Sequence, residues 1–270
     1  MSHVEPLHLG ATQLSVVCEG FAPLDLADEC PGHDVDWRAE RATHPWAFID
    51  GATWPWHVHG FVVHVSGTTI VVDTGLGSFP PYAPWTEQAM GDPWADVDLA
   101  AVDHVVVTHL HADHAGGTVG PDGAARFPNA RYHVHPADET HFEGVDDAEA
   151  YVARGAMAQL ADEGRVALRA EDHEIAPGVR LVHTPGHTPG HRSVIVEGDA
   201  GTVVLTGDLL HLPVQAVNPS WGSSHDEDPA LGARSRTALL GQARDDGLLI
   251  GVPHFARPFG RLTSEGWREA

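Results

Sequence analysis

Short apolar runs rich in β-branched residues recur along the chain, and glycine, proline or aspartate bounds each of them. Runs of this length, several with period-two alternation, predict strands that are buried on one or both faces. The predicted strands are residues 61–65, 68–75, 104–109, 131–135, 179–187, 192–198, 201–208 and 248–254.

Two longer stretches between these runs predict helices. One extends from about Pro136 to Glu163. The other begins at Asp228-Pro229, an N-cap residue followed by a first-turn proline, and ends near Gly247. No repeat, low-complexity tract or flexible linker divides the chain. We therefore predict a single domain, residues 1–270, of α/β class, with helices covering its sheets.

Two aromatic stretches fit neither pattern. Residues 20–57 carry four tryptophans among prolines and acids, and residues 79–94 form a proline-rich aromatic loop. One interpretation is that both are covering loops over the core. The other is that they form an apolar cover over a binding pocket.

The overall composition limits the classes of partner. The chain has 270 residues, of which 42% are hydrophobic, enough for a core of its own. Its 15 Lys and Arg against 38 Asp and Glu give a net charge of −23, which repels phosphate backbones and anionic lipid. We therefore expect no nucleic acid and no membrane as a partner, and a homodimer stays open. Because the N-terminus lacks a signal-peptide pattern and no run of about 18 apolar residues occurs, we expect a cytoplasmic location.

Cysteine and histidine usage decides which side chains carry any metal chemistry. Two cysteines, Cys18 and Cys30, are too few for a disulfide framework or a thiolate cluster. Any metal chemistry must therefore depend on the 21 histidines. The sequence "HVH" at residues 57–59 and 133–135 places histidines two apart with no Asp-His after them. We interpret both as strand faces and not as metal ligands.

The segment "THLHADH" has a richer pattern. His109 and His111 are two apart at the end of a predicted strand, so both imidazoles can point to one side. Asp113 and His114 are adjacent, and they converge only if the chain has turned, which the two glycines that follow make easy. Two pairs of donors suggest two neighbouring metal ions.

Further donors stand at the ends of later predicted strands. His187 follows a Pro-Gly turn, Asp208 ends "VVLTGD", and His254 ends "LLIGVPH". Each of these residues, taken alone, could be present only because turns favour polar side chains. Together they indicate a site beyond the carboxyl ends of the strands, where open α/β folds bind ligands.

The segments "VVDTG", "THLHADH", "TPGHTPGH", "LTGD" and "GVPH" resemble, in this order, the five motifs of the metallo-β-lactamase-fold hydrolases. The resemblance covers about Gly60 to His254. It implies a four-layer αβ/βα sandwich of two mixed sheets flanked by helices, with a dinuclear metal site along one edge.

The resemblance also implies a role for each matching side chain. It makes seven side chains metal ligands: His109, His111 and His187 for one ion, Asp113, His114 and His254 for the other, and Asp208 as the bridge. His191 matches a neighbouring position that is not a ligand. Asp73 resembles the first-motif aspartate, which supports the site from behind the ligands.

The donor set agrees with this assignment. Imidazole and carboxylate without thiolate suit Zn²⁺, Mn²⁺, Fe²⁺ or Co²⁺, and zinc is the default expectation. Two ions about 3.5–4 Å apart would hold a hydroxide that attacks an ester, with Asp113 and Asp208 as the carboxylates of the reaction centre.

Departures from the patterns of known subfamilies reduce the number of possible substrate classes. The β-lactamases place Cys where Asp208 stands, and glyoxalase-type thioesterases add a helical region after the last ligand, whereas 16 residues follow His254 here. Nucleases need a cationic surface, and flavodiiron reductases have Glu in place of His111. Single-domain lactonases and the methyl parathion hydrolase group remain, and both are similar to this chain around "THLHADHAGG".

One position separates these two groups. Quorum-quenching lactonases have Tyr three residues after the bridging Asp, and this chain has His211 there, closer to the parathion hydrolase type. His211 could donate a proton to a leaving oxygen or hold a substrate oxygen. The alternative is a buried histidine hydrogen-bonded to backbone.

The resulting hypothesis is a dinuclear metal hydrolase whose partner is a small, mostly apolar ester, either a lactone or a carboxylic ester. The alternative is an organophosphate triester hydrolase. A thioesterase, a β-lactamase, an iron-dependent redox enzyme and a non-catalytic metal-binding protein rank below these two.

Overall fold

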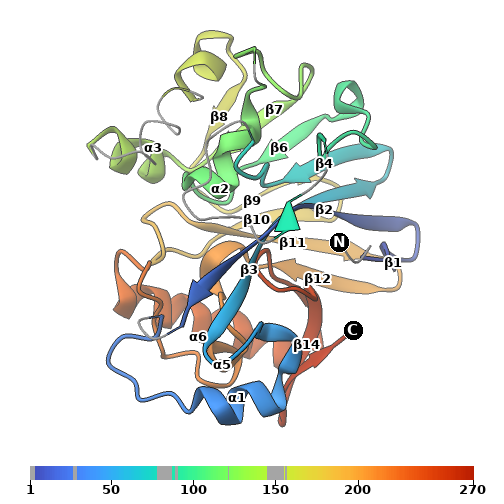
Figure 1. Cartoon of the computed structure of the whole chain (residues 1–270). Coiled ribbons are helices and arrows are strands. Elements are labelled where there is room, and N and C mark those ends of the chain that lie inside the picture. Colours follow the sequence, from blue (N-terminus) through green and yellow to red (C-terminus); the bar gives the residue numbers. More distant parts are fainter. Residues whose placement is uncertain are drawn as a thin grey trace.

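Two mixed β-sheets pack face to face in the computed structural model, with helices along their outer sides (Figure 1). The structure describes residues 4–26, 29–77, 87–88, 91–120, 122–144, 155 and 157–270. Within these residues, no helix has the length and apolar character needed to cross a bilayer.

The first sheet has the strand order β1-β2-β3-β4-β6-β7-β8, and β5 pairs with β2. The pairs from β1 to β4 are antiparallel, whereas β4, β6, β7 and β8 run parallel. Its strands are β1 Leu7–Leu9, β2 Thr12–Asp25, β3 Thr53–Val65, β4 Thr68–Val72, β5 Glu87–Gln88, β6 His104–Val106, β7 Arg131–Val134 and β8 Val166–Leu168.

The second sheet has the order β15-β14-β13-β12-β11-β10-β9. All of its neighbours are antiparallel except the parallel pair β12 and β13. Its strands are β9 His173–Ala176, β10 Val179–His183, β11 Arg192–Gly198, β12 Gly201–Leu205, β13 Leu249–Gly251, β14 Phe259–Thr263 and β15 Gly266–Glu269.

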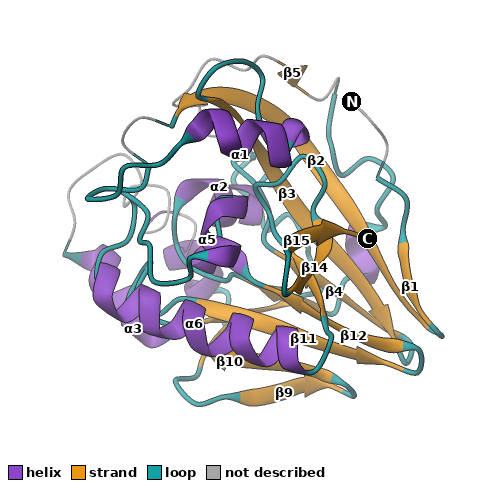
Figure 2. Ribbon diagram, turned by 90° about the horizontal axis from the view of Figure 1, so that it is seen from below, coloured by secondary structure: helices purple, strands orange, loops and turns teal. Residues whose placement is uncertain are grey.

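Helices cover the outer faces and the edge where the strands end. Figure 2 shows α6 along the sheet that contains β10, β11 and β12. The α-helices are α1 Trp37–Thr43, α2 Ala112–Ala115, α3 Pro136–Glu143, α5 Pro213–Val217 and α6 Pro229–Asp245, and residues 157–162 are also helical. Short 3₁₀ helices span Pro45–Ala47, Leu99–Ala101, Gly116–Thr118 and Gly207–Leu209.

Alternation along the strands builds the layers. Val72 of β4 and Leu205 of β12 belong to the core between the sheets. The alternate residues face outward: Val71 packs in the same cluster as Phe142 of α3, and Val204 packs with Leu239 of α6. Because successive side chains point to opposite faces, each sheet is buried on both sides. The expected arrangement of two mixed sheets flanked by helices is confirmed.

Not every predicted element has its predicted bounds. The eight predicted strands correspond to β3, β4, β6, β7 and β10 to β13, and the helix opened by Asp228 is confirmed as α6. The prediction of a single helix over residues 136–163 is wrong at Gly144, and residues 145–154 and 156 of that range lie outside the described residues. The helix that begins at Pro136 ends at Glu143, and the Gly144 N–H donates a hydrogen bond to the His141 carbonyl. Glycine is a poor helix former, so an end at this residue is physically reasonable.

The Trp-rich stretches also differ from expectation. Residues 20–25 belong to β2 and residues 53–57 to β3, so part of the segment 20–57 is sheet and not loop. Trp94 is buried in the core against Phe127, with ring centroids 5.3 Å apart, and does not cover a pocket. Residues 78–86 and 89–90 of the second stretch lie outside the described residues.

Candidate functional site

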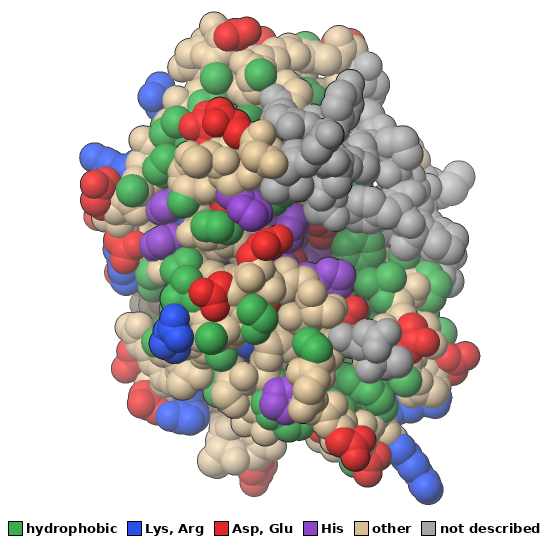
Figure 3. Space-filling model, turned by 90° about the vertical axis from the view of Figure 1, so that its left-hand side faces the viewer, with side chains coloured by type: hydrophobic (Ala, Val, Ile, Leu, Met, Phe, Trp, Pro, Cys, Tyr) green, Lys and Arg blue, Asp and Glu red, His purple; other side chains and the backbone are tan. Residues whose placement is uncertain are grey.

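The predicted site residues meet at one edge of the sandwich, just beyond the carboxyl ends of strands from both sheets. Histidine side chains gather across the middle of this face (Figure 3). Asp73 follows β4, His109 and His111 follow β6, His187 lies between β10 and β11, Asp208 follows β12, and His254 follows β13.

Helix α2 brings Asp113 and His114 to the same place, so the turn predicted for this segment is a helical one. The glycines after α2 are needed for close packing. A Cβ on Gly117 would lie 2.1 Å from the Thr74 carbonyl oxygen, and one on Gly116 would lie 2.4 Å from that of Leu76. Only glycine therefore allows the end of α2 to reach the loop after β4.

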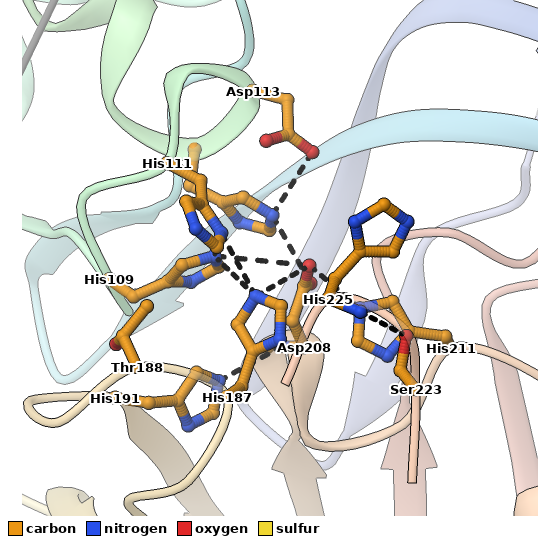
Figure 4. A network of polar contacts seen from close by, with 12 residues as sticks. His109, His111, Asp113, His187, Thr188, His191, Asp208, His211, Ser223 and His225 are labelled. Carbon is orange, nitrogen blue, oxygen red and sulfur yellow. Dashed lines mark hydrogen bonds and ion pairs between the residues drawn. The ribbon is translucent and has the colours of Figure 1, made fainter. Parts of the chain in front are cut away.

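Three imidazoles form the first group of donors (Figure 4). His109 Nε2 lies 2.9 Å from His111 Nδ1, and His187 Nε2 lies 3.2 Å and 3.0 Å from these two atoms. A tetrahedral ion with nitrogen ligands at about 2.0–2.1 Å would separate them by about 3.3 Å. The triangle therefore has the size that one divalent ion requires.

The second group combines two imidazoles with two carboxylates. His114 Nε2 lies 3.2 Å from Asp113 Oδ2 and 3.1 Å from Asp208 Oδ1, and His254 Nε2 lies 3.0 Å from Asp208 Oδ1. The other oxygen of Asp208 lies 3.5 Å from His187 Nε2. The Asp208 carboxylate thus stands between the two groups.

Burial and charge set the protonation of these side chains. Burial lowers the pKa of His111 to about 4 and holds those of His109 and His187 well below the usual range, so these rings are neutral near pH 7. Burial also disfavours charge on His114, but the carboxylates around it raise its pKa well above the ordinary value. A divalent cation would take the place of that proton, because metal binding requires a bare imidazole nitrogen.

Asp73 orients His114. Its backbone has a φ of +59°, a conformation that aspartate tolerates better than most residues. Its carboxylate accepts hydrogen bonds from the Thr108 N–H at 2.8 Å and the Thr108 hydroxyl at 2.9 Å, and it lies 2.7 Å from His114 Nδ1. This contact points His114 Nε2 at the site.

His187 has a comparable support that sequence reasoning missed. Its Nδ1 lies 3.4 Å from Asp226 Oδ1, and the other oxygen of Asp226 pairs with Arg236 at 3.1 Å. The side chains of Asp226 and Arg236 are fully buried. Although burial favours the neutral acid, the contacts with His187 and Arg236 hold the pKa of Asp226 below its usual range. Asp226 lies in the acidic run "HDEDP", which carries no recognised motif.

Two further histidines contact Asp208. His191 Nδ1 donates to the Thr184 carbonyl, and its Nε2 accepts the Asp208 N–H, both at 3.0 Å. Both nitrogens of His191 are thus occupied by the chain, in keeping with its expected role outside the ligand set. His211 Nε2 lies 3.1 Å from Asp208 Oδ2, and within the described structure its ring makes no hydrogen bond to backbone.

Asp138, also missed at the sequence level, joins two of the loops that carry the imidazoles. From the start of α3 its carboxylate accepts the Leu110 N–H at 3.2 Å, the Thr188 hydroxyl at 3.0 Å and the Gly190 N–H at 2.6 Å. The loop of His109 and His111 is thereby tied to the loop of His187.

Replacing Asp138 with alanine is expected to lower the free energy of unfolding by about 3 kcal/mol, because three donors lose their acceptor in a buried place. The looser loops should also weaken zinc binding by about tenfold or more. Urea unfolding and zinc titration measure both effects. Glu139→Ala, the next residue of α3, is the matched control, and equal effects in the two variants would contradict this role.

Comparison with known proteins places the site in a family context. The sequence profile of the metallo-beta-lactamase superfamily matches residues 53–254. An N-acyl homoserine lactonase of Bacillus sp. is 34% identical over 134 residues, which cover 49% of this chain and 48% of that protein. One of Bacillus cereus is 35% identical over 137 residues, covering 50% and 46%. The chain thus matches about half the length of these curated relatives.

Solved structures show the same fold over nearly the whole chain. The hydrolase AbOPH of the beta-lactamase superfamily is similar with a TM-score of 0.84 at 20% identity, covering 100% of this chain and 98% of that one. AidC, a dizinc quorum-quenching lactonase solved with a product, is similar with a TM-score of 0.81 at 18% identity, covering 99% and 97%.

Proposed function

The chain belongs to the metallo-beta-lactamase superfamily, as its motifs predicted, and on that premise we propose that it is a metal-dependent hydrolase of small apolar esters, foremost lactones. The observation that carries this proposal is the convergence of seven donor side chains on one edge, from α2 and from the segments that follow strands of both sheets. Asp208 stands between two groups of the size that divalent ions need. The lactonase relatives, matched over about half their length, support lactones as the substrate class.

The side chains present fit two divalent ions, and zinc is the ion we propose. His109, His111 and His187 would hold one, Asp113, His114 and His254 the other, and Asp208 both. Two buried atoms that face the site, His114 Nε2 and Asp208 Oδ1, have no hydrogen-bond partner within the described structure, which suits a centre built for cations. When bound, the two ions would lower the pKa of water and stabilise negative charge on the attacked ester.

The chain's own residues would supply orientation, apolar surface and a proton. Asp73 and Asp226 hold His114 and His187 in place. We propose that His211 donates a proton to the leaving oxygen of the ester. Its ring adjoins Asp208, and imidazole is the side chain best suited to proton transfer near pH 7.

Apolar rings border the site and favour an apolar substrate. Trp54 and Trp56 of β3 lie against His254, with ring centroids 6.1 Å and 5.5 Å apart, and Phe142 of α3 meets His111 edge-on at 5.5 Å. The Trp-rich segment 20–57 thus contributes two rings next to the donors. A net charge of −23 disfavours anionic substrates in addition.

A substrate panel tests the proposed function. Lactones, aryl carboxylic esters, thioesters, β-lactams and phosphotriesters should be assayed on one preparation whose metal content is measured. We expect turnover of lactones or aryl esters that chelation abolishes and zinc restores. Absence of turnover on every carbonyl ester by metal-replete protein would refute the proposal, and turnover of phosphotriesters alone would favour the alternative.

His211→Asn tests the role of His211 separately. We expect kcat to fall by about 100-fold or more, the usual contribution of a general acid, with metal content unchanged. His64→Asn, an exposed histidine of β3, is the control. An unaltered kcat in the His211 variant would show that the ring has only a structural role.

A further inference from the structure

A second cluster of metal-binding side chains lies on the first sheet, apart from the seven donors above. Cys18 of β2 and His57 and His59 of β3 place one donor atom each within 4.8 Å of one another. Local spacing offers no reason to join them, because residues 57–59 lack a following Asp-His pair and one cysteine cannot form a thiolate cluster. Strand pairing brings them together.

The register of β2 and β3 explains the cluster. Cys18 stands directly opposite His59, and His57 points to the same side as His59 because it lies two residues away along the strand. The register then shifts between Cys18 and Gly20, leaving Glu19 as an extra residue. The Glu19 carboxylate accepts the N–H groups of Leu76 and Gly77, away from the cluster. Such bulges often occur beside functional sites.

The hydrogen bond of His59 determines which of its nitrogens has a lone pair. Its Nε2 lies 3.0 Å from the Phe255 carbonyl oxygen, which can only accept, so Nε2 carries the hydrogen. Nδ1 is then a bare acceptor. The ring is only 2% exposed, and Nδ1 has no hydrogen-bond partner within the described structure. Metal-ligating histidines commonly have this arrangement, with the outer N–H bound to a backbone carbonyl.

The distance between Cys18 and His57 suits a metal ion with mixed sulfur and nitrogen ligands. Cys18 Sγ lies 3.8 Å from His57 Nδ1. Tetrahedral zinc, with its sulfur ligand at about 2.3 Å and its nitrogen ligand at about 2.0–2.1 Å, would separate these atoms by about 3.6 Å. Burial keeps His59 neutral by lowering its pKa to about 3, so its lone pair is present across the working pH range.

We propose that Cys18, His57 and His59 form an additional site for a borderline-soft divalent ion such as Zn²⁺, with a fourth position left for water. Binding would convert the Cys18 thiol to a thiolate and release its proton to solvent. The ion would fasten β2 to β3 next to the His57 carbonyl, which lies 2.6 Å from His254 Nδ1. This inference goes beyond the proposed function and does not depend on it.

Cobalt titration of the full chain tests the site, because the seven donors at the sandwich edge include no sulfur. After chelation, added Co²⁺ should produce a thiolate-to-metal charge-transfer band in the near ultraviolet. Cys18→Ser should abolish the band and remove about one bound ion per chain, since cobalt and zinc accept the same ligands. Cys30→Ser is the matched control, because Cys30 is buried in a separate apolar cluster, and it should keep the band. No band in the wild type, or an equal band in Cys18→Ser, would overturn the proposal.

A measurement on the wild-type protein tests the same site without depending on whether the Cys18 variant folds. Alkylation of Cys18 by iodoacetamide, followed by peptide mass spectrometry, should slow by about tenfold or more once Zn²⁺ is added, because a metal-bound thiolate is a poorer nucleophile than a free one. Equal rates with and without Zn²⁺ would contradict a thiolate ligand at this position.

Discussion

Asp208→Ala is expected to lower kcat for ester hydrolysis by about a thousandfold or more and to remove at least one metal ion per chain. Its Oδ1 lies 3.1 Å from His114 Nε2 and 3.0 Å from His254 Nε2, and its Oδ2 lies 3.5 Å from His187 Nε2. Removing this carboxylate would take away the group that stands between both sets of donors, which we propose to be their shared ligand, and a large electrostatic contribution to the reaction. Metal analysis and steady-state kinetics on the best substrate of the panel measure the two effects.

Asp245→Ala provides the matched control for that result. Asp245 ends α6, and its exposed carboxylate pairs with Arg244, so the same substitution there should leave kcat and metal content unchanged. If Asp208→Ala turned over substrate at the wild-type rate, the donors at the sandwich edge could not be the reaction centre.

Arg236→Met is expected to produce the largest loss of stability, about 3–5 kcal/mol in the free energy of unfolding. The guanidinium is fully buried and donates to the carbonyls of Leu209, Pro219 and Trp221 as well as to Asp226. Without it, the Asp226 carboxylate stays buried with no cation beside it, which is the costly way to break a buried ion pair. Guanidinium chloride unfolding measures the loss.

The same helix supplies a control for this prediction. Arg244→Met removes an exposed arginine of α6, whose pair with Asp245 should contribute less than about 1 kcal/mol. The double variant Arg236→Met, Asp226→Asn should lose less stability than the two single variants lose in sum, because it leaves no unpaired buried charge. A loss below about 1 kcal/mol in Arg236→Met would mean that solvent compensates Asp226.

The local sequence pattern was sufficient to predict the elements whose residue types are set by burial or by neighbours a few positions away. The valine-rich runs located β4, β6 and β12, because a strand buried on both faces must be apolar throughout. Asp228-Pro229 located the start of α6, because capping and first-turn proline act within a few residues. The motif "THLHADH" likewise identified four of the donors through residue type and spacing alone.

Elements that depend on their neighbours were missed or misplaced. β2 has an irregular burial pattern, and its long pairing with β3 is a tertiary interaction that cannot be predicted from the residues of β2 alone. The predicted helix over residues 136–163 continued past Gly144, because helical propensity on both sides outweighed one glycine in the pattern.

The sequence by itself determined the order of the buried strands along the chain and which side chains could bind metal, because residue type and short spacing encode both. Only the tertiary structure decided what supports and joins those side chains. Asp138, Asp226 and Arg236 lie outside every motif, and Cys18 meets His59 only through the register of two strands. Contacts between residues far apart in the chain depend on how strands pair and loops pack, and no local spacing records that.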